Sequence, residues 1–143
     1  MSCFARRLFC VWIFLFWLLS MTTVSYAQDY MPKVMTLMSY NIRNATSDDG
    51  RVDFDDVVSV ISKYDADFVA LQELDSVTGR SAGKDVLREL ALLSQYYPIY
   101  GPSIKYDGGK YGLGILSKQR PLSVKQISLP GREEARTLLG GVR

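Results

Sequence analysis

The chain has 143 residues, of which 48% are hydrophobic and 22% are charged, and its formal net charge is +2 at pH 7. This size and composition indicate one folded domain and exclude a disordered or collagen-like chain. The chain has no histidine, and both cysteines, Cys3 and Cys10, lie in the first ten residues. Zinc fingers, Ser-His-Asp triads and Cys-His nucleophiles are therefore excluded for the chain as written.

Residues 1–27 have the pattern of a signal peptide. Arg6 and Arg7 precede an apolar run at 8–19, and small residues at Ser25 and Ala27 fit a cleavage site. Because the run is short for a bilayer span, we expect an exported protein, periplasmic or secreted, that is not stably held in a membrane. An uncleaved anchor is the alternative. Cleavage would remove two arginines and no acidic residue, which leaves 15 acidic and as many basic residues and gives no broad attraction to nucleic acid.

A short tether at 28–33 leads to a domain that we expect to span 34–143. The apolar stretch from Val34 to Asn41 predicts a strand, followed by a loop rich in turn formers. The next segment predicts a helix at 53–64, with Asp53 capping its first turn. The apolar residues at helical spacing there are Phe54, Val57, Val58, Ile61 and Tyr64.

The short apolar run from Phe68 to Leu71 predicts a strand covered on both faces, and a strand, helix, strand order implies a parallel pair. A loop at 76–83 precedes a second predicted helix at 84–95. The rest predicts short strands at 97–100, 111–117, 122–129 and from Thr137 onward. Because the last run ends without a cap or polar tail, we expect the domain to be truncated inside a strand.

Asn41 and Glu73 follow the two strands of the predicted parallel pair. Such strands end at the same edge of a sheet, where ligands bind in open α/β folds. An amide oxygen and a carboxylate suit Mg²⁺, Mn²⁺ or Ca²⁺ better than zinc or copper. The alternative from the residues alone is that Asn41 begins a turn and Glu73 is a solvated strand end.

Three segments in order resemble the endonuclease/exonuclease/phosphatase (DNase I-like) family. They are MSYNIR at 38–43, VALQELD at 69–75 and KYGLGILSK at 110–118. Members of that family begin with a strand ending S-x-N-I/V and a second ending L-Q-E. The resemblance implies an α/β fold, a four-layer αββα sandwich of two mixed sheets, of which this chain would hold roughly the N-terminal half.

The resemblance also implies metal-dependent hydrolysis of phosphoester bonds with Mg²⁺ or Mn²⁺. Glu73 would be the main metal carboxylate, and Asn41 would reach the metal or the scissile phosphate. Tyr111 would contact substrate at the cleft rim, and Arg80 and Arg136 would hold phosphate. The substrate would be a phosphorylated small molecule, a lipid head group or a nucleic acid, and no obligate protein partner is expected.

Two features depart from the family pattern. Arg43 stands where the abasic-site branch has an acidic or amide residue. The later Asp-x-Asn and Ser-Asp-His motifs, including the group that orients the attacking water, do not occur. The first expectation is therefore an exported phosphodiesterase or phosphatase represented by an N-terminal fragment that is inactive alone. The alternative is a truncated or non-catalytic relative that acts as a binding protein.

Overall fold

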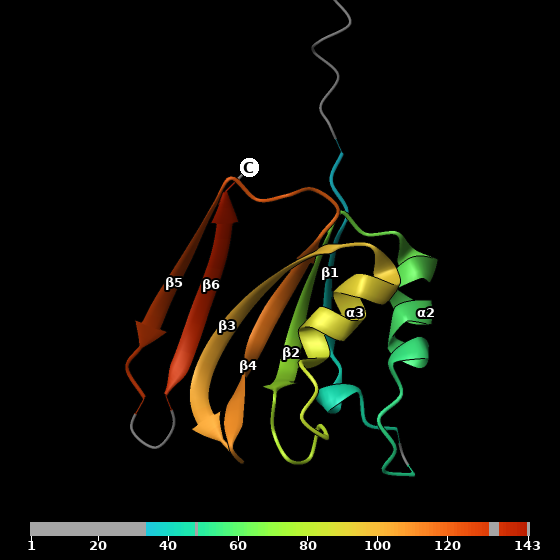
Figure 1. The fold of residues 1–143 in the computed structure, drawn as a ribbon. Helices are drawn as coiled ribbons and strands as arrows, with labels where there is room; N and C mark the ends of the chain where they lie inside the picture. The colour runs from blue at the N-terminus through green and yellow to red at the C-terminus, as the bar shows by residue number, and fades with distance from the viewer. Residues whose placement is uncertain (1–33, 48, 132–134, 143) are drawn as a thin grey trace, which may run out of the picture. The chain divides into compact units, whose positions relative to one another are not determined.

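The computed structural model describes residues 34–47, 49–131 and 135–142. The helices and strands assigned in these ranges lie in one compact unit, Met35–Arg143 (Figure 1). The predicted signal peptide at 1–27 and tether at 28–33 fall outside the described residues. Within those residues, every helix is too short or too polar to cross a membrane.

A four-stranded mixed sheet forms the centre of the fold, in the order β1-β2-β4-β3. β1 pairs in parallel with β2, whereas β4 is antiparallel to both β2 and β3. The predicted parallel pair is therefore confirmed. β1 begins three residues later than the strand predicted from Val34, whereas β2, β3 and β4 extend further than predicted. Their bounds are Leu37–Asn41 for β1, Phe68–Ser76 for β2, Tyr97–Tyr106 for β3 and Gly109–Ser117 for β4.

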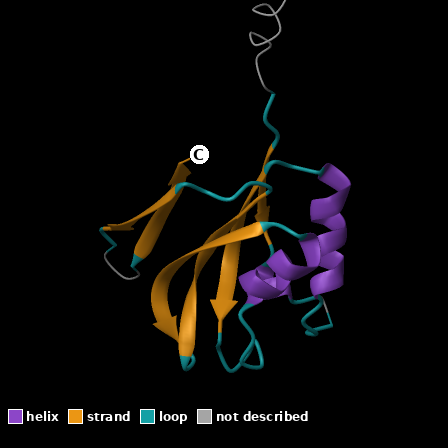
Figure 2. Cartoon of the chain, turned by 45° about the horizontal axis from the view of Figure 1, so that its top comes forward, coloured by secondary structure: helices purple, strands orange, loops and turns teal. Residues whose placement is uncertain are grey.

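Two helices cover one face of this sheet (Figure 2). α2 spans Phe54–Tyr64, and the Asp53 carboxylate accepts hydrogen bonds from the first-turn N–H groups of Asp55 and Asp56, as expected for an N-cap. α3 spans Val86–Ser94, a little shorter than predicted, because Asp85 caps its start. Both helices bury an apolar stripe, so the 3.6-residue periodicity located them correctly.

A second sheet, β5 (Ser123–Leu129) with β6 (Arg136–Val142), packs against β3 and β4 from the other side. Thr137 Oγ1 donates a hydrogen bond to the Pro102 carbonyl at 2.9 Å, which ties β6 to β3. The layers are thus helix, sheet and sheet, in agreement with the expected two-sheet α/β fold. Among the described residues the second sheet is an antiparallel pair rather than a mixed sheet.

The main hydrophobic core lies between the helices and the four-stranded sheet. Its side chains come from α2, α3 and the inward positions of β2 and β4, and burying them supplies the principal driving force for folding. Fully buried members include Ile61, Val69, Leu71, Leu74, Leu87, Leu90 and Leu116.

Gly112 lies where β4 passes close to the backbone of β3. A Cβ at this position would collide with the Gly101 carbonyl oxygen and would stand 3.0 Å from Pro102 Cα. Both obstacles are backbone atoms that cannot rotate away, so the two strands need glycine there.

We expect Gly112→Ala to lower the free energy of unfolding by about 2 kcal/mol or more, because the strands must separate locally. Urea unfolding followed by circular dichroism measures the change. Gly140→Ala is the matched control, since a Cβ there meets no atom within 4 Å. Equal stabilities of the two variants would contradict the close approach.

Candidate functional site

Asn41 and Glu73 meet at the edge where β1 and β2 end. Asn41 is opposite Gln72 in the parallel register, so Glu73 lies one residue past the last pair. Asn41 Nδ2 donates a hydrogen bond to Glu73 Oε1 at 2.8 Å. The parallel pairing therefore brings the two side chains into direct contact, as the strand order predicts.

A β-bulge in β2 sets the position of Glu73. Leu71 pairs with Gly114 and Leu74 pairs with Gly112, so two residues of β2 face one residue of β4. Glu73 has φ of 61°, in the left-handed region that non-glycine residues rarely occupy. Bulges of this kind redirect a side chain, often beside active sites. Here the bulge places the carboxylate next to Asn41.

The Asn41 amide has a fixed orientation. The Arg43 backbone N–H donates to Asn41 Oδ1 at 3.0 Å, so the atom facing it must be the oxygen. Nδ2 is then directed at Glu73, whose Oε1 accepts its hydrogen bond. Among the described residues, Glu73 Oε2 has no hydrogen-bond partner. One carboxylate oxygen is held, and the other is available to a ligand.

The loop after β1 is pinned to the end of β2. Arg43, Asn44 and Ala45 all have positive φ and form a tight left-handed turn, η2 (Arg43–Ala45). Asn44 is buried, and its Oδ1 accepts a hydrogen bond from the Asp75 N–H at 3.1 Å. Asparagine tolerates left-handed backbone and supplies the buried acceptor here. This contact fixes the loop that carries the Arg43 N–H.

Asp75 is a buried carboxylate held by Arg80 and Thr78. Arg80 Nε donates to Oδ2 at 2.6 Å and Nη2 donates to Oδ1 at 2.9 Å, while Thr78 Oγ1 donates to Oδ2 at 2.7 Å. Burial acts to raise the pKa of Asp75, but the hydrogen bonds from Arg80 and Thr78 hold it below its ordinary value. The pair also raises the pKa of Arg80.

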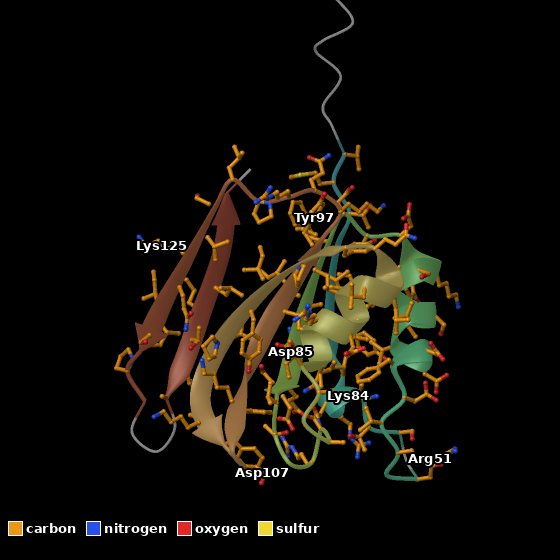
Figure 3. All side chains as sticks on the ribbon, viewed as in Figure 1. Arg51, Lys84, Asp85, Tyr97, Asp107 and Lys125 are labelled. Carbon is orange, nitrogen blue, oxygen red and sulfur yellow. The ribbon has the colours of Figure 1, made fainter. Side chains whose placement is uncertain are left out.

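Two tyrosines flank the Arg80 guanidinium. Its Cζ lies 4.5 Å from the ring centre of Tyr106 and 5.5 Å from that of Tyr111, both within cation–π range. The β3–β4 turn also holds the backbone of Arg80 in place, because the backbone N–H of Arg80 donates a hydrogen bond to Asp107 Oδ2 at 2.9 Å. Figure 3 shows Asp107 at the tip of the β3–β4 hairpin, toward which β2 also runs.

The predicted site residues thus fall into three places. Asn41 and Glu73 touch each other, and Arg80 and Tyr111 form a second cluster around Asp75, two residues further along β2. Arg136 begins β6 and is exposed, with no hydrogen bond or ion pair to either group among the described residues.

Sequence reasoning missed three members of this edge. Tyr106, Asn44 and Asp75 were not among the predicted site residues. The sequence holds one signal for the ion pair of Asp75 with Arg80. An acidic residue ends an apolar strand and stands five positions before an arginine.

The oxygen donors at this edge fit a hard cation only in part. Among the described residues, no group of three or more His, Cys, Asp or Glu side chains could hold a metal. Glu73 Oε2 and the second lone pair of Asn41 Oδ1 are the available donors. One or two protein ligands, with water and a substrate phosphate completing the shell, is an arrangement that Mg²⁺ accepts.

Comparison with known proteins gives matches over most of the folded unit. The profile of the Endonuclease/Exonuclease/phosphatase family matches residues 38–139. An endonuclease/exonuclease/phosphatase from Beutenbergia cavernae aligns with a TM-score of 0.64 and 24% identity, over 75% of this chain and 33% of that one. A family protein from Leptotrichia buccalis aligns with a TM-score of 0.60 and 14% identity, over 76% and 49%.

These structural alignments show the fold. The chain spans about a third to a half of the length of the two solved structures. A search of curated proteins finds no match.

We expect Arg80→Met to lower the free energy of unfolding by about 2 kcal/mol at pH 7, because it leaves the buried Asp75 carboxylate without its main donor. In the wild type, the pair stabilises the fold above the ordinary Asp pKa, and this is lost as pH falls through the lowered folded pKa. In the variant, the unpaired carboxyl takes up a proton more readily.

The difference between wild type and variant should therefore shrink between pH 7 and about pH 3, a window that reaches below the ordinary Asp pKa. Urea unfolding at both pH values measures it. Arg88→Met, at an exposed position of α3, is the control and should change stability little. A difference that does not vary with pH would contradict the role assigned to the ion pair.

Proposed function

The chain belongs to the endonuclease/exonuclease/phosphatase family, and we propose that it provides the metal-binding edge of an exported phosphoester hydrolase that uses Mg²⁺ or Mn²⁺. The family is one of phosphoesterases and nucleases, which is the coarse activity class. The metal, the export and the two site residues are our assignment.

The contact between Asn41 and Glu73 is the observation that carries this proposal. A bulged strand places a carboxylate at the carboxyl end of a parallel pair, and a neighbouring amide holds one of its oxygens at 2.8 Å. The Arg43 N–H fixes that amide in turn. These two successive hydrogen bonds keep the Glu73 carboxylate in one orientation. A carboxylate held in this way is preorganised to coordinate a cation.

Each residue of the edge has a separate task in this scheme. Glu73 Oε2 coordinates the cation, and Asn41 keeps the carboxylate aimed at it. A bound Mg²⁺ or Mn²⁺ supplies Lewis-acid stabilisation of the negative charge that develops on the phosphoryl oxygens and the leaving group. Tyr111 lies one strand away, on β4, where it would contact the substrate. These residues bind and orient, and they do not themselves take a proton from water.

A second function is favoured by the composition of the chain. The sequence contains no histidine and no Asp-x-Asn step, so none of its residues is assigned as the base that activates water. A chain that keeps the metal edge without the base would bind phosphoesters without cleaving them. Metal binding and turnover therefore have to be measured separately.

The substrate we propose is a small or lipid phosphoester outside the cytoplasm. After cleavage at residue 27 the chain would have equal numbers of basic and acidic residues. A net charge of zero gives no long-range attraction to a polyanion, which argues against duplex DNA as the main substrate.

We expect Glu73→Gln to weaken Mn²⁺ binding by at least about tenfold, because it replaces the coordinating carboxylate with a neutral amide. Electron paramagnetic resonance titration of Mn²⁺ measures the affinity without any turnover. Glu89→Gln changes the same residue type on α3 and is the control that should leave binding unchanged.

Hydrolysis of bis-p-nitrophenyl phosphate in Mg²⁺ separates the two functions. Turnover that disappears in Glu73→Gln supports the hydrolase, and Mn²⁺ binding without turnover supports the binding protein. Equal Mn²⁺ affinities of the wild type and Glu73→Gln would refute the metal assignment for both.

A further inference from the structure

We infer that Arg80 is a positioning residue rather than a phosphate ligand, and that the contact it supports is the exposed ring of Tyr106, which stacks on a planar organic group of the substrate. The phosphoester part of this inference rests on the proposed function. The positioning of the ring rests on the geometry around Asp75.

One of the two bidentate edges of the Arg80 guanidinium is bound within the protein. Nε and Nη2 both donate to Asp75, at 2.6 and 2.9 Å, and this is one of the two edges with which arginine can grip a phosphate. Because Asp75 is fully buried, releasing Arg80 to a substrate would leave a buried charge unpaired. Arg80 is therefore held by the protein, and its guanidinium lies against the two rings that it contacts.

The position of Arg80 supports Tyr106. Arg80 Cζ lies 4.5 Å from the Tyr106 ring centre, and Arg80 Nη1 lies 3.5 Å from the Tyr106 hydroxyl oxygen. The neighbouring Tyr111 ring is 6.2 Å away and tilted by 55°. The next residue, Asp107, accepts the Arg80 N–H. The ring is thus held through a side-chain stack and a backbone contact.

Tyr106 nevertheless keeps 40% of its surface exposed. Since Arg80 stacks over the ring, the exposed part offers a rigid aromatic surface to a ligand. A ring that is already ordered loses little entropy on binding and stacks well on another planar group.

The exposed ring lies within reach of the metal edge. Tyr106 pairs with Gly109 at the end of the β3–β4 hairpin, and Tyr111 pairs with Asp75, two residues from Glu73. Two residues of a strand span about 7 Å, which brings the Tyr111 position close to Glu73. The Tyr106 ring centre lies a further 6.2 Å from that of Tyr111. The two rings, Tyr111 and beyond it Tyr106, form an aromatic wall beside this edge. An ester with its phosphate at Glu73 would extend an attached aromatic group along this wall toward Tyr106. We expect the wall to select aryl or nucleobase-bearing esters over alkyl ones, which narrows the substrates proposed above to small esters that carry a planar group and disfavours lipid phosphoesters.

The chain contains a natural control for this arrangement. On α2, Lys63 Nζ lies 5.9 Å from the ring centre of Tyr64, which is 60% exposed. In this pair too a cation lies beside an exposed ring. Lysine, however, has no planar guanidinium to stack on the ring, and no ion pair of Lys63 with a buried carboxylate is found among the described residues. Tyr64→Leu therefore removes an equivalent ring from a surface that is not part of the site.

The test compares the affinities of phenyl phosphate and methyl phosphate for the full chain in Mn²⁺, measured by NMR titration. We expect phenyl phosphate to bind about five- to tenfold more tightly in the wild type, the usual gain from an added aromatic contact. Tyr106→Leu should remove this preference and leave methyl phosphate binding unchanged. Tyr64→Leu should leave both affinities unchanged.

Arg80→Lys distinguishes positioning from direct phosphate binding. It keeps the positive charge beside Asp75 but loses the planar fork and its stack. We expect it to reduce the phenyl preference with little change for methyl phosphate. Equal weakening of both esters would show that Arg80 binds phosphate itself and would overturn the inference. Failure of the wild type to prefer phenyl phosphate, or to bind either ester, would also overturn it.

The outcome is separable from that of the proposed function. The ratio of the two affinities is read without turnover, and repeating it in Glu73→Gln shows whether it depends on the metal carboxylate. If the preference for phenyl phosphate persists when Mn²⁺ binding is lost, the result supports the aromatic contact at Tyr106 but not the metal site. Intact Mn²⁺ binding without the preference refutes the wall alone.

Discussion

The buried carboxylate of Asp75 is the constraint on which the open edge of the sheet depends. A charge removed from water must be paired and hydrogen-bonded, and here Arg80 and Thr78 pair the carboxylate while Asn44 satisfies its backbone N–H. Each of these partners comes from a loop that leaves the sheet. Satisfying one buried group therefore orders the loops after β1 and β2 together.

This arrangement links the two parts of the candidate site. The bulge that positions Glu73 and the buried Asp75 are two residues apart in one strand. The turn that presents the Arg43 N–H to Asn41 also presents Asn44 to Asp75. The contact of Asn41 with Glu73 and the cluster of Arg80, Tyr106 and Tyr111 are consequently connected, since both depend on the same few residues of β2.

Much of the fold could be predicted from local patterns. The helix at 53–64 and the parallel pairing of β1 with β2 follow from apolar periodicity and from the order of the elements. The lengths of β2 and β3 were underestimated, because both strands continue into polar residues whose pairing depends on a neighbouring strand. Cross-strand hydrogen bonds, rather than local apolar content, set those ends.

By itself the sequence determined the element order, the family and the meeting of Asn41 with Glu73, because strand direction follows from chain connectivity. Only the tertiary structure decided which groups Arg80 contacts. Its bidentate edge faces the buried Asp75, and its stacking partners come from β3 and β4. An exposed arginine in a loop looks the same in sequence whether it meets a phosphate or a carboxylate. The choice depends on which charge the fold buries beside it, and burial is a property of the whole packed chain.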